Sequence, residues 1–262
     1  MIEALLFGVL IGMLLGLTGA GGGVLAVPAL VLGLGWPITQ AAPVALMAVG
    51  GAAALGAIDG LRKGLVRYRA ALLMAGLGAL MAPLGLYVAH RLPGSVLATL
   101  FSAVLVMVAV RMIKAQQATD AAGWQQKNCM MDADTGRLHW TRKCATTLAV
   151  LGACCGFLSG LLGVGGGFLL VPAFRQLTDI RVHGIVATSL MVVALVSTVA
   201  IVGALRTGVA VPAAGGGFIA ACLVGMLIGR ALSPWVPAQA LQRLFAAVCL
   251  VVAACMLIHT WG

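Results

Sequence analysis

The stretch GLLGVGGGFLLVPAF, Gly160 to Phe174, decides the fold, because it puts three consecutive glycines inside a run apolar enough for a membrane. Glycine is the poorest helix former after proline, and a helix in lipid must satisfy its own backbone hydrogen bonds. The stretch therefore predicts a helix that breaks at the glycines. Non-helical backbone at that depth is tolerated only where protein or a water-filled cavity surrounds it, so the break should lie inside a bundle.

The composition is typical of an integral membrane protein. Hydrophobic residues make up 62% of the 262 positions and charged residues only 8%, which leaves too little polar surface for a soluble globule. Segments apolar enough to enter or cross a bilayer recur along the whole chain. They lie at roughly 4–31, 38–58, 70–90, 95–113, 146–174, 182–205, 211–229 and 240–259. The first lacks a basic flank, so we expect it to belong to the mature fold rather than to a signal peptide.

Charge and cysteine usage exclude several function classes. The net charge is +10, but Lys and Arg lie between the apolar segments, as topology determinants do, so we expect no nucleic-acid partner. The seven cysteines form no C-x-x-C pair and are expected to be small buried hydrophobes rather than redox or metal groups. Adjacent Cys154 and Cys155 point to different sides of a helix, so they should not bond each other. We expect neither a cofactor nor a metal. We also expect that the protein is not an enzyme, because no nucleophile is accompanied by its base.

The chain is internally duplicated. GLTGAGGGVLAVPAL, Gly16 to Leu30, matches the opening stretch at ten of fifteen positions, and the same shift of 144 residues continues without a gap as far as Phe101 and Phe245. The duplication predicts two all-α units, residues 1–113 and 146–262, each a glycine-broken segment followed by three transmembrane helices. A polar linker at 114–145 joins them, and its stretch MDADTGRLHWT is compatible with a small hairpin outside the bilayer.

The distribution of charge bears on the orientation of the two units. If each broken segment crosses the membrane once, the units are parallel; if each is a re-entrant hairpin, three spans remain per unit and the second unit is inverted. With the linker in the cytoplasm, the inverted arrangement puts fourteen Lys and Arg residues inside and two outside, against eleven and five in the parallel one. The positive-inside rule favours inversion, which also recurs among transporters. We therefore expect both termini outside, and the parallel arrangement stays as the alternative.

The glycine breaks predict a site for a small anion. The half-helices that start after them, at about Val24 and Phe168, begin with N–H groups that have no intrahelical partner, and such groups bind anions. We expect the two breaks to meet near the centre of the bundle and to form one site there. We place the hydroxyls of Thr188 and Ser189 mid-span, where they would contribute to this site. The predicted site consists of Thr18, Gly19, Ala20, Gly21, Gly22, Gly23, Gly163, Val164, Gly165, Gly166, Gly167, Thr188 and Ser189.

Each of these features has a structural alternative. Glycines can simply let helices pack, which is the interpretation we favour for Gly12, Gly50, Gly76 and Gly225. Hydroxyls within a helix often bond the preceding turn, which is the alternative for the two hydroxyls of the predicted site. Asp59, with Arg62 and Lys63 beside it, is expected to be an interfacial charge pair rather than a proton carrier.

The duplicated pattern G-x-x-G-x-G-G-G-x-x-x-V-P, at Gly16–Pro28 and Gly160–Pro172, together with VATSL at Val186–Leu190, resembles the TauE/SafE sulfite exporter family. The resemblance covers nearly the whole chain. It implies a multi-pass secondary carrier of the bacterial inner membrane that exports small sulfur-containing anions such as sulfite or organosulfonates, with protons as the expected coupling ion. The first unit departs from the pattern, with PVALM at Pro43–Met47. An anion channel without ion coupling is the alternative function, and a homodimer is left open.

Overall fold

The protein, described by a computed structural model, is a bundle of helices. The structure describes residues 2–19, 22–121, 129, 141–163, 166–178, 182–206, 212–235 and 238–261. The helices are α1 (Ile2–Thr18), η1 (Gly22–Leu25), α2 (Ala26–Pro28), η2 (Ala29–Gly33), α3 (Ile38–Arg62), α4 (Tyr68–Arg91), α5 (Gly94–Ala121), α6 (Arg142–Leu162), α7 (Gly167–Leu177), α8 (Val182–Arg206), α9 (Ala213–Leu232), η3 (Ser233–Trp235) and α10 (Ala238–Trp261). Within the described residues no strand forms.

The predicted all-α integral membrane fold is confirmed. Among the described residues, six helices are long and apolar enough to cross a membrane, namely α3, α4, α5, α6, α8 and α9. Their outer surfaces carry large apolar side chains, such as Leu80 at 67% exposure and Val150 at 61%. An apolar surface of this extent would be unfavourable in water and suits contact with lipid.

Both glycine-broken segments fold back on themselves as helical hairpins. The chain from η1 to η2 returns alongside α1, because a Cβ added to Gly22 would meet Leu15 and one added to Gly33 would meet the ring of Phe7. In the second segment, α7 has 11 residues and therefore rises about 16 Å, roughly half of the hydrocarbon core. Neither returning arm is long enough to cross a bilayer.

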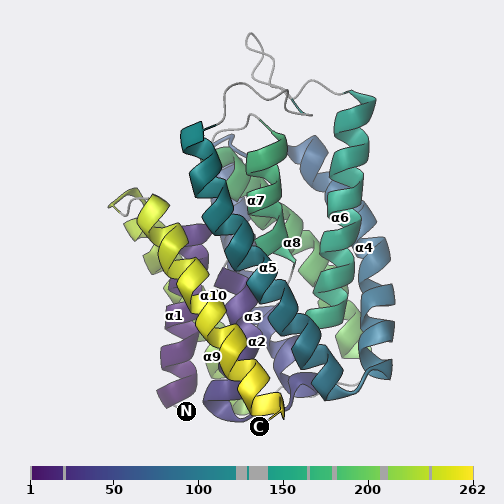
Figure 1. Ribbon diagram of the computed structural model, residues 1–262, viewed down its shortest axis with the longest axis vertical. Helices are drawn as coiled ribbons and strands as arrows, with labels where there is room; N and C mark the ends of the chain where they lie inside the picture. The colour runs from purple at the N-terminus through teal and green to yellow at the C-terminus, as the bar shows by residue number, and fades with distance from the viewer. Residues whose placement is uncertain are drawn as a thin grey trace.

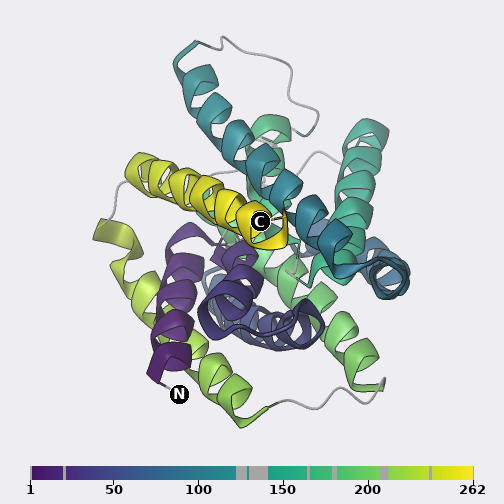
Figure 2. The ribbon, with the colours of Figure 1, turned by 60° about the horizontal axis from the view of Figure 1, so that its bottom comes forward.

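The two ends of the bundle differ in what they carry. In Figure 1 both termini lie at one end, whereas α5 ends and α6 begins at the opposite end, which we call the linker side. Asp59, in the last turn of α3, bonds Arg230, in the last turn of α9, so these two helices end on the same side of the bundle. Figure 2, turned so that the bottom of Figure 1 comes forward, shows α10 running beside α5.

The helices pack in pairs that join the first unit to the second. Helix α1 packs along α9, α6 along α4, α3 along α8, and α5 along α10. The first two pairs approach closely through glycines on one face: Gly8, Gly12 and Gly16 face the backbone of α9, and Gly152, Gly156 and Gly160 face the backbone of α4. These two sets differ by 144 residues. Each contact in one pair therefore has its counterpart in the other.

The glycines expected to serve packing do so at three of four positions. A Cβ on Gly12 or Gly225 would overlap the backbone of the partner helix, and one on Gly50 would lie 2.7 Å from the Cβ of Ser197. The expectation is wrong for Gly76, which faces open space. The predicted linker is also shorter than 114–145, because α5 runs to Ala121 and α6 begins at Arg142. The predicted hairpin in the linker lies outside the described residues, apart from Thr141.

Candidate functional site

The first break is held by a side chain of its own hairpin. Gly19 has a φ of 88°, which a residue with a side chain rarely adopts, and it lies against Val186 of α8. The hydroxyl of Thr18 donates to the carbonyl of Leu14 at 2.7 Å and accepts from the N–H of Gly22 at 3.1 Å. Gly22 and Gly23 are buried, whereas Ala20 and Gly21 lie outside the described residues. One of the predicted anion donors, the N–H of Gly22, is therefore already bonded within the chain.

At the second break, the helix that follows, α7, begins without a side chain that caps its first turn. Gly163 closes α6 with a φ of 70°, and Gly166 precedes α7 with a φ of 59° and no side-chain hydrogen bond to the turn that follows. Gly167 is buried as the first residue of α7, while Val164 and Gly165 lie outside the described residues. The buried hydroxyl of Ser159, one turn earlier in α6, has no partner among the described residues. Among the described residues, this break therefore has one unpartnered hydroxyl, that of Ser159, whereas the hydroxyl of Thr18 at the first break is bonded.

The two breaks lie near opposite ends of helix α3. Gly163 lies against Ala42 near the start of α3, whereas Gly19 lies against Val186, whose neighbour Ala187 faces Gly60 near the end of α3. Ala42 and Gly60 are about 27 Å apart along the axis of α3, at 1.5 Å per residue. The elements that follow the breaks do approach each other, since η1 contacts α7. The tips of the hairpins are thus separated, and their returning arms meet.

The two predicted hydroxyls differ in their partners. Ser189 donates to the carbonyl of Val186 at 2.9 Å, which is the back-bonding within its own helix that we gave as the alternative. Thr188 instead accepts from the backbone N–H of Arg67 at 3.1 Å, 121 residues away in the sequence. Both are fully buried. Because α8 begins at Val182, they lie in its first two turns at the linker side, and the prediction of a mid-span position is wrong.

A charged cluster on the linker side joins α3 to α9. Asp59 bonds Lys63 at 2.9 Å, which confirms the expected charge pair, and it also bonds Arg230 at 2.7 Å. Arg230 further donates to the carbonyl of Gly56 at 3.0 Å. These side chains line a cavity of about 290 Å³, together with apolar residues of α3 and α9 such as Leu55. Sequence reasoning missed Arg230, because no local pattern links it to a residue 171 positions earlier.

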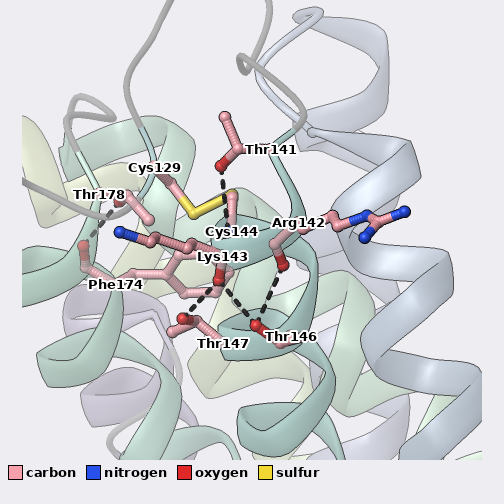
Figure 3. The surroundings of a disulfide bond; sticks show 9 residues. All are labelled: Cys129, Thr141, Arg142, Lys143, Cys144, Thr146, Thr147, Phe174 and Thr178. Carbon is pink, nitrogen blue, oxygen red and sulfur yellow. Dashed lines mark hydrogen bonds between the residues drawn. A yellow bond between two sulfur atoms is a disulfide. The ribbon is translucent and has the colours of Figure 1, made fainter.

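The expectation that every cysteine is a small buried hydrophobe is wrong for two of them. Figure 3 shows the disulfide between Cys129 and Cys144, whose Cα atoms are 5.0 Å apart. Cys144 lies in the first turn of α6, where its N–H donates to the hydroxyl of Thr141, and Cys129 pairs with Thr178 after the end of α7. The linker is therefore tied to both arms of the second hairpin.

Of the remaining five cysteines, three follow the expectation of burial and two do not. Cys155, Cys222 and Cys249 are buried, whereas Cys154 and Cys255 are exposed. Cys154 and Cys155 lie on different sides of α6 and do not bond each other, as expected.

Comparison with known proteins identifies a membrane transporter. The family described as "Sulfite exporter TauE/SafE" matches residues 4–256. A probable membrane transporter protein of Xylella fastidiosa strain 9a5c is 32% identical over 71% of this chain and 67% of its own length. A second, from strain Temecula1, is 28% identical over 97% of this chain and 94% of its own. No solved structure matches the chain significantly. These relatives point to a transporter and not to an enzyme, as the sequence predicted.

Proposed function

Because this chain belongs to the TauE/SafE sulfite exporter family, we propose that it is a secondary carrier of small sulfur-containing monoanions such as sulfite and organosulfonates. Export is the direction that the family description suggests. A monoanion is the easier cargo, because a site built from helix N-termini and hydroxyls provides only partial charges, each helix end contributing about 0.3–1 kcal/mol and more when partly buried.

The observation that carries this proposal is the pair of half-helices inside the bundle. η1 and α7 follow the two glycine breaks, contact each other and lie among buried residues of the interior, such as Val24 and Leu170. Discontinuous helices from two repeats that meet inside a bundle are the usual construction of an anion site in secondary carriers. Because the two breaks lie near opposite ends of α3, we propose two ligand shells: backbone N–H groups of 19–23, with Thr18, Thr188 and Ser189 contributing hydroxyls, on the linker side, and backbone N–H groups of 163–167 on the other side.

The proposed carrier has two inverted repeats, residues 1–113 and 146–262. Two observations support inversion: α3 and α9 end on the same side, where Asp59 meets Arg230, and the termini lie opposite the linker side. In a parallel arrangement the end of α9 would lie across the membrane from the end of α3. With the linker in the cytoplasm, as the distribution of Lys and Arg favours, both termini face outward across the bacterial inner membrane. Protons are the proposed coupling ion.

Transport by purified protein tests the proposal. Proteoliposomes are loaded with labelled sulfite, sulfoacetate, sulfolactate or taurine, and efflux is followed with and without a pH gradient. We expect saturable flux of at least one of these anions. A pH gradient should accelerate this flux, whether the protons move with the anion or against it. Flux that rises linearly with concentration and ignores the gradient would favour a channel instead. Absence of flux of every sulfur anion would contradict the proposed substrate class.

A further inference from the structure

Arg67 carries a buried donor that no described group of the protein satisfies. It ends the short loop between α3 and α4, and its Nε is buried without a hydrogen-bond partner among the described residues. An unpaired buried donor is unfavourable, and more so when the group is charged. A group of this kind calls for an explanation, and an absent ligand is one of the few available.

The surroundings of Arg67 consist of further donors. Its backbone N–H is bonded to the hydroxyl oxygen of Thr188, which leaves the hydroxyl hydrogen of that fully buried threonine free to donate elsewhere. Arg67 is also the residue before the first turn of α4, and no side chain caps that turn. The first N–H groups of α4 therefore have no intrahelical partner. A guanidinium N–H, a hydroxyl and a helix start thus lie together.

No carboxylate among the described side chains is available to neutralise this cluster. The described carboxylates are those of Glu3 and Asp59. Asp59 is bonded to Lys63 and Arg230, and Glu3 lies in the first turn of α1, at the end of the bundle that carries the termini. Among the described residues, the cluster around Arg67 is therefore positively charged and acceptor-poor. Arg67 as a whole is partly exposed, but its Nε and the side chain of Thr188 are buried. An oxyanion would supply the missing acceptors.

We propose that Arg67 and Thr188, with the first turn of α4, bind one small oxyanion on the linker side of the bundle. A sulfonate or hydrogen sulfite fits, because it carries one negative charge and several oxygens that can accept from Nε, from the hydroxyl and from backbone N–H groups at once. The site rests on the proposed function, for which it names the residues that hold the anion on one side of the membrane. It also supplies the cation that the glycine breaks lack.

The residues that the 144-residue shift equates with this pair have different chemistry. Val44 stands in place of Thr188, and Val211 in place of Arg67. Neither valine has a polar side chain. The proposed site therefore belongs to the linker side alone, and the carrier is asymmetric in how it holds its anion.

Binding to the purified full-length protein in lipid nanodiscs tests this site. Methanesulfonate and hydrogen sulfite are titrated calorimetrically into the parent protein, Arg67→Gln and Arg62→Gln. Arg67→Gln removes the guanidinium but keeps the backbone N–H that bonds Thr188, and Arg62→Gln removes an equal charge from an exposed neighbour. We expect a dissociation constant at least tenfold higher for Arg67→Gln, as for loss of a hydrogen bond to a charged group, and a change within twofold for Arg62→Gln. Equal affinities for these two variants would overturn the site.

Variants of Thr188 keep the test decisive if Arg67→Gln does not fold. Thr188→Val should weaken binding at least tenfold, and Thr188→Ser, which retains the hydroxyl, should restore it; parental affinity in Thr188→Val overturns the site. The outcome is also separable from the proposed function. A parent protein that binds methanesulfonate but transports no sulfur anion contradicts the carrier and leaves the site standing. A parent that transports, with Arg67→Gln binding as tightly, contradicts the site alone.

Discussion

Two glycines of α4 should respond in opposite ways to the same substitution by alanine. A Cβ added to Gly85 would overlap the carbonyl oxygen of Phe157 and lie 2.8 Å from the N of Leu161, both backbone atoms of α6. A Cβ added to Gly76 would have nothing within 4 Å. Backbone cannot rotate out of the way as a side chain can, so only Gly85→Ala should force the two helices apart.

The magnitude follows from the size of the overlap. Ordinary contacts of a Cβ begin near 3.4 Å, so α4 and α6 must separate locally by several tenths of an ångström or more. Overpacking of this kind typically costs about 1–3 kcal/mol, while alanine gains up to about 1 kcal/mol over glycine within a helix. Gly85→Ala should therefore lose about 1–2 kcal/mol, and Gly76→Ala should gain up to about 1 kcal/mol. At about 2–4 °C per kcal/mol for a chain of this size, the apparent Tm should fall by about 2–8 °C in the first and rise slightly in the second.

Thermal unfolding of the variants in one detergent measures the difference. The fraction that stays monodisperse on size exclusion after heating gives an apparent Tm for each. Gly229→Ala provides a further comparison, because its added Cβ would overlap the carbonyl oxygen of Met13 on α1, the contact that corresponds to Gly85 and Phe157 under the 144-residue shift. Gly229→Ala should therefore behave as Gly85→Ala does. If Gly85→Ala melts no lower than Gly76→Ala, the close approach of α4 and α6 is refuted.

Three further predictions concern the first break and the topology. Gly22→Ala should abolish anion efflux from proteoliposomes while the protein still inserts, because the added Cβ would lie 2.7 Å from the Cα of Leu15; parental flux would show that this close approach is dispensable. A cysteine at Ile2, in a variant without other accessible cysteines, should react with an impermeant maleimide in intact cells, and labelling only after permeabilisation would contradict an outward N-terminus. The Cys129–Cys144 disulfide of the structure conflicts with a cytoplasmic linker, because the cytoplasm keeps thiols reduced. If the proposed orientation is right, Cys129 and Cys144 should be alkylated as two thiols in acid-quenched cells. A disulfide found in such cells would place the linker side in an oxidising compartment and reverse the proposed orientation.

The parts of the fold that the sequence predicts are those with a local signal. Three glycines in a row followed by a proline predict the end of one helix and the start of another, and Gly19, Gly163 and Gly166 have the positive φ values that such a break favours. The spans are predictable from apolar runs of sufficient length. Both signals lie within a few residues of the feature that they predict.

The parts that escape prediction are contacts between distant residues. The Asp59–Arg230 pair joins positions 171 residues apart, and the bond from Arg67 to Thr188 joins positions 121 apart. No periodicity or spacing encodes such a partner. The disulfide was missed for a related reason, since two cysteines 15 residues apart with no C-x-x-C spacing resemble the other isolated cysteines of the chain. Arg67 is one of many interfacial cations in the sequence, but in the structure its Nε is buried with no partner among the described residues, and no local pattern predicts that burial.

The two halves of the chain share their packing and differ in their polar chemistry. Glycines that set helix contacts recur under the shift, as Gly12 and Gly156 do, whereas Thr188 and Arg230 correspond to Val44 and Leu86. In the proposed carrier, shared packing and different polar residues would have separate physical effects. Inward-facing and outward-facing states can be close in energy when the repeats exchange conformations, because each repeat then adopts the packing that the other repeat had before. A bound anion then stabilises only the state in which the polar side chains of the linker side can reach it, since a ligand shifts an equilibrium by its differential affinity for the two states. Symmetric packing would keep both states accessible, and the asymmetric polar residues would decide from which side the anion is bound more tightly.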